Sequence, residues 1–427
     1  MNQFRFPAVK MPDTESALRA SVRQLVDQEV KAGRIVPQSN SWSIHDAAFS
    51  QRLGQAGFLG MTWPRRYGGH ERSTLERYVV VEELLAAGAP VGAHWVADRQ
   101  SGYQILRHGS ERARSTILPR IAAGTCFFGI GMSEPDSGSD LAAVRSRARK
   151  TEDGWRISGS KVWTSGAHHA HYLIALVRTG GAEAQRHGGL TQFIIDTTQP
   201  GIDIRPIHNL YGGHDFNQIS FDDCWVPDDM MIGQEGSGWD MVTGELAFER
   251  SGPDRFLTSF PLLRQVLGAL TQDGSTRVLH EHSGHADHDQ AEHADHDHSG
   301  HPDHGQAKHA VHDQAERAFD HQEAAAIGRL LSHLMALRSM STSIAGMLEQ
   351  GAQPVVEAAL VKDLGTAFER EVPERLRSLL PMEAMLGDEH GLSHHWGMTM
   401  LQSPSFTLRG GTREILRGMI ARGLGLR

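Results

Sequence analysis

Residues 132–140 read MSEPDSGSD and residues 159–166 read GSKVWTSG, and these two stretches decide how the rest of the chain is interpreted. Both place small hydroxyl residues beside glycine, so backbone N–H groups and hydroxyls can approach a flat or anionic ligand closely. Trp163 offers an aromatic surface beside them. From the residues alone, a ligand site and two plain surface turns of a β domain both remain open.

The secondary structure that the sequence predicts differs between the region of these stretches and the regions before and after it. Short β-rich runs separated by Gly, Asp and Pro turns extend over residues 126–230 and predict a middle β domain. Apolar residues at helical spacing predict a helical domain over residues 1–125 and another over 231–427. The expected helices cover residues 15–30, 46–59, 75–87, 93–106, 238–249, 318–349, 354–380 and 412–424, and the expected strands 155–157, 161–163, 172–177, 192–195, 202–207 and 218–221.

Composition excludes several classes of protein. The chain has 427 residues and a formal net charge of -9, with no basic stripe of the kind that binds nucleic acid. Two cysteines are too few for a disulfide framework. We find neither a secretory signal nor an apolar run long enough for a membrane span, so we expect a cytoplasmic protein.

The two glycine-rich stretches closely resemble the signature of the acyl-CoA dehydrogenase family, in which a T-E-P-x-x-G-S-D loop and a W-I-T segment hold the isoalloxazine ring of FAD. The resemblance extends to GFLGMTWPRRYGG at 57–69 and to GGTREILRGMIAR at 410–422. It implies an α+β fold with an N-terminal helical domain, a middle β-barrel or sandwich and a C-terminal four-helix bundle. It also implies α,β-dehydrogenation of an acyl-CoA to the enoyl-CoA, as in fatty acid β-oxidation, with hydride transfer to flavin N5.

Carried over by position, the resemblance assigns roles to individual residues. Those assigned to FAD are Met132, Ser133, Ser139, Trp163, Thr164, Ser165, Thr412 and Glu414. Those assigned to the substrate are Ser139, Leu246, Arg250 and Gly411. Thr412 begins an expected helix, whose N-terminal N–H groups favour the FAD pyrophosphate.

The family's proton-abstracting glutamate is missing from its usual place. In many members it immediately precedes the Gly-Thr of the C-terminal motif, where this chain has Gly410. LAFER at 246–250 resembles the segment that supplies the base in the branch of isovaleryl-CoA dehydrogenase, which implies that Glu249 is the base.

The helical spacing supports a special environment for Glu249. It continues the stripe of Trp239, Val242 and Leu246, and a carboxylate on an apolar face is expected to have a raised pKa. The alternative is a structural surface pair with Arg250. Glu245, one turn earlier, is the nearest competing base.

Two features depart from the family. We find no R-x-x-F-G motif between residues 256 and 323, although in most members its Arg reaches the FAD of a neighbouring subunit. FAD is still expected, with an electron-transfer flavoprotein as acceptor and a homo-oligomer (dimer or tetramer) or hetero-oligomer as the assembly. Residues 277–321 form the second departure, a histidine-rich low-complexity insert.

Residues 285–316 of this insert consist of four octads, HADHDQAE, HADHDHSG, HPDHGQAK and HAVHDQAE. Imidazole and carboxylate groups could hold adventitious divalent metal, but a tolerated surface loop is the favoured interpretation and we assign no metal site.

Two other functions stay open. An acyl-CoA oxidase would share the motifs and differ in letting O₂ reach the reduced flavin. A non-catalytic partner subunit of a hetero-oligomeric dehydrogenase, or a retired enzyme scaffold that binds metal, would not need Glu249.

Overall fold

The computed structural model describes residues 4–180, 187–271, 321–380, 383–386 and 391–426, with the backbone alone at 245–248 and at 271. Residues 277–320 of the predicted insert therefore lie outside the described residues.

Helices form the N-terminal part of the fold. The hydroxyl of Ser73 and the carboxylate of Glu76 cap the third helix reciprocally, a capping box that fixes where it begins. The helices are α1 (Glu15–Lys31), α2 (Ala47–Gln55), α3 (Thr74–Ala86), α4 (Gly92–Val96), α5 (Gly102–His108) and α6 (Glu111–Ala122).

The prediction that residues 93–106 are helical is confirmed, but the helix is not a regular α-helix throughout. A π-helical turn, Ala97–Ser101, separates α4 from α5. It places Gly102 against the Trp63 indole, where an added Cβ would lie 2.3 Å from a ring carbon. Single π turns of this kind occur often at functional sites.

Strands form the middle part. They are β1 (Phe128–Gly131), β2 (Arg147–Thr151), β3 (Gly154–Ser165), β4 (Tyr172–Arg178), β5 (Leu190–Asp196), β6 (Ile202–Ile207), β7 (Phe216–Val226) and β8 (Met231–Ile232). Within the described residues they make one sheet in the order β6-β7-β3-β2-β4-β5-β8, with β1 parallel to β4. The runs predicted at 155–157 and 161–163 belong to the single strand β3.

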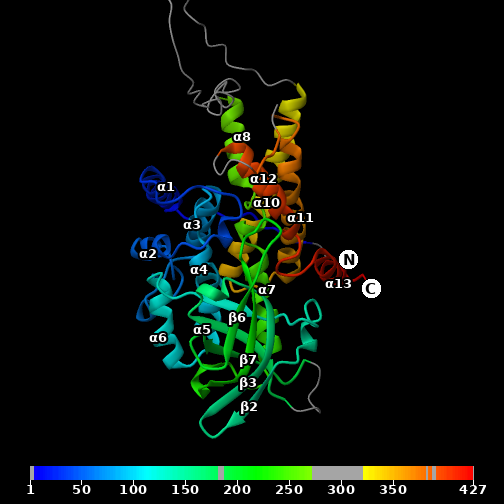
Figure 1. Ribbon diagram of the computed structural model, residues 1–427. Helices are drawn as coiled ribbons and strands as arrows, with labels where there is room; N and C mark the ends of the chain where they lie inside the picture. Colours follow the sequence, from blue (N-terminus) through cyan, green and yellow to red (C-terminus); the bar gives the residue numbers. More distant parts are fainter. Residues whose placement is uncertain (1–3, 181–186, 272–320, 381–382, 387–390, 427) are drawn as a thin grey trace, which may run out of the picture.

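Helices return after β8 and complete the predicted α+β architecture. They are α7 (Gly238–Arg250), α8 (Phe260–Thr271), α10 (His321–Glu349), α11 (Val355–Leu376), α12 (Leu392–Gln402) and α13 (Arg413–Gly423). In Figure 1, α8, α10 and α11 stand above the sheet, the N-terminal helices lie along one side, and α7 lies between the upright helices and the sheet. The order of helical, sheet and helical parts is confirmed.

Among the helices of the described segments, none is both long and apolar enough to cross a membrane. The two cysteines, Cys126 and Cys224, are free and buried.

Candidate active site

The two glycine-rich stretches meet at the end of β3. The backbone N–H of Val162 donates to the Ser133 carbonyl at 2.9 Å. The fully buried Lys161 ammonium donates to the Met132 carbonyl at 3.1 Å and to Glu134 Oε1 at 2.8 Å. The loop with Met132 and Ser133 is therefore fixed to the strand that carries the second motif.

Glu134 binds this loop to a third segment. Its carboxylate accepts from the backbone N–H groups of Arg145, at 2.6 Å, and Ser146, at 2.9 Å. Burial lowers the pKa of Lys161 to about 8, although Glu134 opposes the shift. Burial also works against the charge of Glu134, yet Lys161 and the donated hydrogen bonds keep its pKa below the usual value. Sequence reasoning assigned no role to this pair, although both residues lie in the quoted motifs.

Trp163 has a left-handed backbone conformation, φ 62°, where β3 and β7 shift register between Lys161 and Thr164. A β-bulge of this kind re-aims a side chain. The Trp163 indole is accordingly 58% exposed, with its edge toward Phe216 at 6.0 Å between ring centroids. A strained, non-glycine position that exposes an aromatic ring is the kind of feature found at ligand sites.

Thr164 and Ser165 follow this bulge with different surroundings. Thr164 is 1% exposed, and its Oγ1 has no hydrogen-bond partner in the part of the chain that the structure describes. A buried hydroxyl without a protein partner is able to hydrogen-bond a bound ligand. Ser165 lines a cavity.

This first cavity has a volume of about 940 Å³ and is lined by all three parts of the chain. Trp95 and Arg99 contribute from the N-terminal part and Ser165 from β3. Glu249 and Gly410 contribute from the C-terminal part. A residue of the second glycine-rich motif and the predicted base therefore share one cavity.

Glu249 is held near the end of α7 by two arginines. Its backbone carbonyl accepts from Arg99 and from Arg255, whose Nε and Nη2 lie at 3.0 and 2.8 Å. Its carboxylate is 18% exposed, with Oε1 at 3.4 Å from Arg255 Nη2. Glu249 thus lines the cavity, and its carboxylate makes a long ion pair with Arg255.

Gly410 leaves room for this carboxylate. A Cβ added at Gly410 would lie 2.3 Å from Glu249 Oε1, and the Gly410 backbone has φ +65°, which disfavours any side chain. Many family members carry their base at the position of Gly410. The Glu249 carboxylate, although far from Gly410 in the sequence, lies in the space beside that position.

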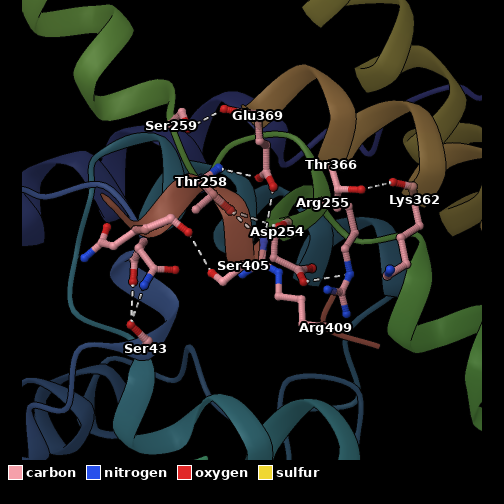
Figure 2. A network of polar contacts seen from close by, with 12 residues as sticks. Ser43, Asp254, Arg255, Thr258, Ser259, Lys362, Thr366, Glu369, Ser405 and Arg409 are labelled. Atoms are coloured by element: carbon pink, nitrogen blue, oxygen red, sulfur yellow. Dashed lines mark hydrogen bonds and ion pairs between the residues drawn. The ribbon is translucent and has the colours of Figure 1, made fainter. Parts of the chain in front are cut away.

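A network of buried charges lies next to Glu249, and Figure 2 shows its members Asp254, Arg255, Glu369 and Arg409. Asp254 Oδ2 lies 3.1 Å from both Arg99 Nη1 and Arg255 Nε. Burial disfavours the charged form of Asp254, but the neighbouring arginines stabilise it and keep the pKa of Asp254 below its usual value. The two arginines that hold the Glu249 carbonyl are thus themselves fixed by one carboxylate.

A second carboxylate, Glu369, anchors the arginine that precedes Gly410. Arg409 Nη2 lies 3.2 Å from Glu369 Oε2, and the Thr258 N–H donates to the other carboxylate oxygen at 2.7 Å (Figure 2). Burial raises the pKa of Glu369 to about 7.

Lys362 fixes the same turn from α11. It is fully buried, and its Nζ donates to the Gly411 carbonyl at 2.6 Å. Burial lowers the pKa of Lys362 to about 7. The glycine turn opposite Glu249 is therefore held on both sides.

A second cavity, of about 810 Å³, lies on another side of Glu249. Glu249, Arg99 and Gln100 line both cavities. Two of these residues come from the π turn Ala97–Ser101. The remaining wall comes from α5, from α7 with the segment before it, and from Gln353, Val355 and Met419.

The other predicted residues lie apart from the walls of the two cavities. Ser139 and Glu414 are exposed, and Thr412 is the residue before α13. The Glu414 carboxylate accepts a hydrogen bond from the Glu414 backbone N–H and another from the Thr412 side chain, and both lower the pKa of Glu414. Arg250 is 5% exposed with Nη1 at 2.9 Å from Met419 Sδ, rather than paired with Glu249 on the surface. The Leu246 and Glu245 side chains lie outside the described atoms.

No group of three or more His, Cys, Asp or Glu side chains in the described segments is arranged to hold a metal ion.

Comparison with family models identifies the class. The models described as "Acyl-CoA dehydrogenase, N-terminal domain", "middle domain" and "C-terminal domain" match residues 12–125, 129–224 and 307–425. The chain belongs to the acyl-CoA dehydrogenase family.

Individual relatives are similar over part of their length. Acyl-CoA dehydrogenase IpdE1 of Mycobacterium tuberculosis is 38% identical over 203 residues, 48% of this chain and 52% of that protein. Acyl-CoA dehydrogenase FadE29 of the same organism is 37% identical over 237 residues, 55% of this chain and 60% of that protein. The chain thus matches little more than half the length of these curated relatives.

A solved structure, the Tcur3481-Tcur3483 steroid ACAD, superposes with a TM-score of 0.77 at 25% identity and covers 98% of this chain and 99% of that chain. The ChsE4-ChsE5 complex from Mycobacterium tuberculosis, at 24% identity and a TM-score of 0.73, supports the fold alone.

Proposed function

We propose that this chain is an FAD-dependent acyl-CoA dehydrogenase in which Glu249 removes the α-proton of an acyl-CoA thioester. The observation that carries the proposal is the position of the Glu249 carboxylate in the space beside Gly410, on the same cavity wall as Ser165. Arginine contacts to its carbonyl hold the end of α7, so the base is pre-organised before substrate binds.

The described residues fit a flavin. The exposed Trp163 indole offers a stacking surface, the buried Thr164 hydroxyl lacks a partner, and Ser165 faces the cavity. When bound, FAD supplies the acceptor for the hydride that leaves the substrate β-carbon. The chain's own task is to position the thioester and to take the proton at a Glu249 carboxylate oxygen.

The second cavity is proposed as the acyl site. It shares Glu249 with the first cavity, so an acyl group there would present its α-carbon to the carboxylate. Its volume of about 810 Å³ suits a bulky acyl group. A polycyclic acyl group is our preferred substrate, because a relative of the same fold is described as a steroid ACAD.

Electrons are proposed to pass to an electron-transfer flavoprotein. The assembly is proposed to be an oligomer, either of identical chains or with a second subunit, since the solved relative pairs two different chains by name. Light scattering of the purified chain, with flavin per chain measured beside it, separates the two arrangements.

The test is anaerobic titration of the FAD-loaded protein with straight, branched and ring-bearing acyl-CoA thioesters. Bleaching of the flavin by at least one ring-bearing thioester is expected, with slow reoxidation in air. Reoxidation within seconds would favour an oxidase. A protein that cannot be loaded with FAD would contradict the proposal and favour a partner subunit.

A further inference from the structure

Gln104 is an unusual residue in the wall of the second cavity. It lies on α5 and is 3% exposed. Neither its Nε2 nor its Oε1 has a hydrogen-bond partner within the described segments, although it lines the cavity. A buried amide without partners costs free energy of folding, and one beside a cavity can recover part of that cost by a hydrogen bond to a ligand there.

The charges of the cavity wall indicate which ligand group Gln104 meets. Arg99 and Arg107 contribute two positive side chains, and Asp240 and Glu249 two negative ones. The wall thus has no excess charge that would select a charged acyl group. An uncharged carbonyl or hydroxyl oxygen is the natural partner, because an amide offers both a donor and an acceptor.

The π turn lies beside the part of the cavity wall to which Gln104 belongs. The turn precedes α5 and carries Arg99 and Gln100, which line the cavity together with Gln104. The insertion of one residue into a helix re-aims the residues that follow it. The helix that bears Gln104 is therefore attached directly to the segment beside Glu249.

We propose that Gln104 is a specificity residue that hydrogen-bonds a carbonyl or hydroxyl oxygen on the acyl group, so that oxygenated polycyclic acyl-CoA thioesters are preferred over their deoxygenated counterparts. This inference rests on the proposed function of the second cavity. The contact lies at the acyl body rather than the reacting carbons, so it contributes to binding more than to the chemical step.

The experiment compares polycyclic acyl-CoA thioesters that carry a ring ketone at different positions with the matched compound that has CH₂ there. The wild-type holoenzyme is expected to show roughly tenfold higher kcat/KM for at least one ketone. Gln104→Leu is expected to remove that preference by raising KM for the ketone, with little change for the deoxygenated compound.

Gln192→Leu is the matched control. Gln192 is a fully buried glutamine on β5, also without partners for its amide in the described segments, and lies outside both cavity walls. It should retain the wild-type preference. Equal kcat/KM for ketone and deoxygenated compounds in the wild type, or an unchanged preference in Gln104→Leu, would overturn the inference.

Failure of the proposed function is distinguished by binding measurements. If no thioester reduces the flavin, calorimetric titration of the same ketone and deoxygenated pair into Glu249→Gln and Glu249→Gln/Gln104→Leu still measures the contact. Tighter binding of the ketone only when Gln104 is present supports the inference, and equal binding to both variants refutes it.

Discussion

Replacing Gly410 by alanine would place a methyl group in the space that the Glu249 carboxylate occupies. The added Cβ would lie 2.3 Å from Glu249 Oε1, whereas ordinary contacts begin at 3.4 Å. The Gly410 backbone, held between Arg409 and the Gly411 carbonyl contact of Lys362, has little freedom to retreat. The carboxylate is therefore the group that must move.

Two effects of different size follow from this change. Alanine in the left-handed conformation at φ +65° costs roughly 1 kcal/mol of folding free energy. Displacement of the carboxylate by about 1 Å lowers the rate of proton removal on the order of a hundredfold. Gly410→Ala should thus fold and bind FAD but reduce its flavin far more slowly.

The assay is anaerobic stopped-flow measurement of flavin bleaching by an active acyl-CoA, with thermal denaturation beside it. Gly33→Ala is the matched control, since Gly33 has φ +66° and no atom within 4 Å of an added Cβ. It should lose similar stability and keep the wild-type rate. A Gly410→Ala rate within threefold of wild type would refute the assigned contact between Gly410 and Glu249.

Two further predictions concern buried charges. Glu134→Gln leaves the fully buried Lys161 ammonium without its carboxylate partner. Urea denaturation should show that the free energy of unfolding falls by about 3 kcal/mol, and flavin absorbance should show less bound FAD. An unchanged free energy of unfolding would contradict the role of the pair. The pKa of Lys362 is about 7 in the folded chain, against an ordinary value of 10.5. Between pH 7 and 10.5 Lys362 is therefore protonated in the unfolded chain but neutral in the folded chain, so the free energy of unfolding should rise with pH. Lys362→Met should flatten this rise, whereas the exposed Lys10→Met should not, and identical pH profiles for Lys362→Met and wild type would contradict the shift.

The order of helical, β and helical parts could be predicted because periodicity and turn residues are local signals. β3 is a partial example, since both short runs predicted at 155–157 and 161–163 are strand, although they belong to one strand that ends at Ser165. The interruption before α5 could not be predicted in this way. The apolar spacing of residues 93–106 is compatible with a regular helix, and contact of Gly102 with Trp63 depends on the folded arrangement.

The site was only partly predictable for the same reason. The family resemblance directed attention to Glu249 and Gly410, which the structure brings into contact. The pairs Lys161–Glu134 and Lys362–Gly411 join segments far apart in the sequence, and no spacing rule reports such contacts. Ser158, Gly159 and Trp163 of the same strand are exposed, so the strand itself gave no signal that Lys161 is buried.

The measurement that tests the central claim most directly is flavin reduction in Glu249→Gln beside Glu245→Gln. Both variants remove one carboxylate from α7 and keep the size of the side chain. Glu249→Gln is predicted to remain yellow and to lose at least a thousandfold in the rate of bleaching by acyl-CoA, as expected when an essential base is removed. Glu245→Gln is predicted to bleach at nearly the wild-type rate. Wild-type bleaching in Glu249→Gln, or loss of bleaching in Glu245→Gln alone, would contradict the account.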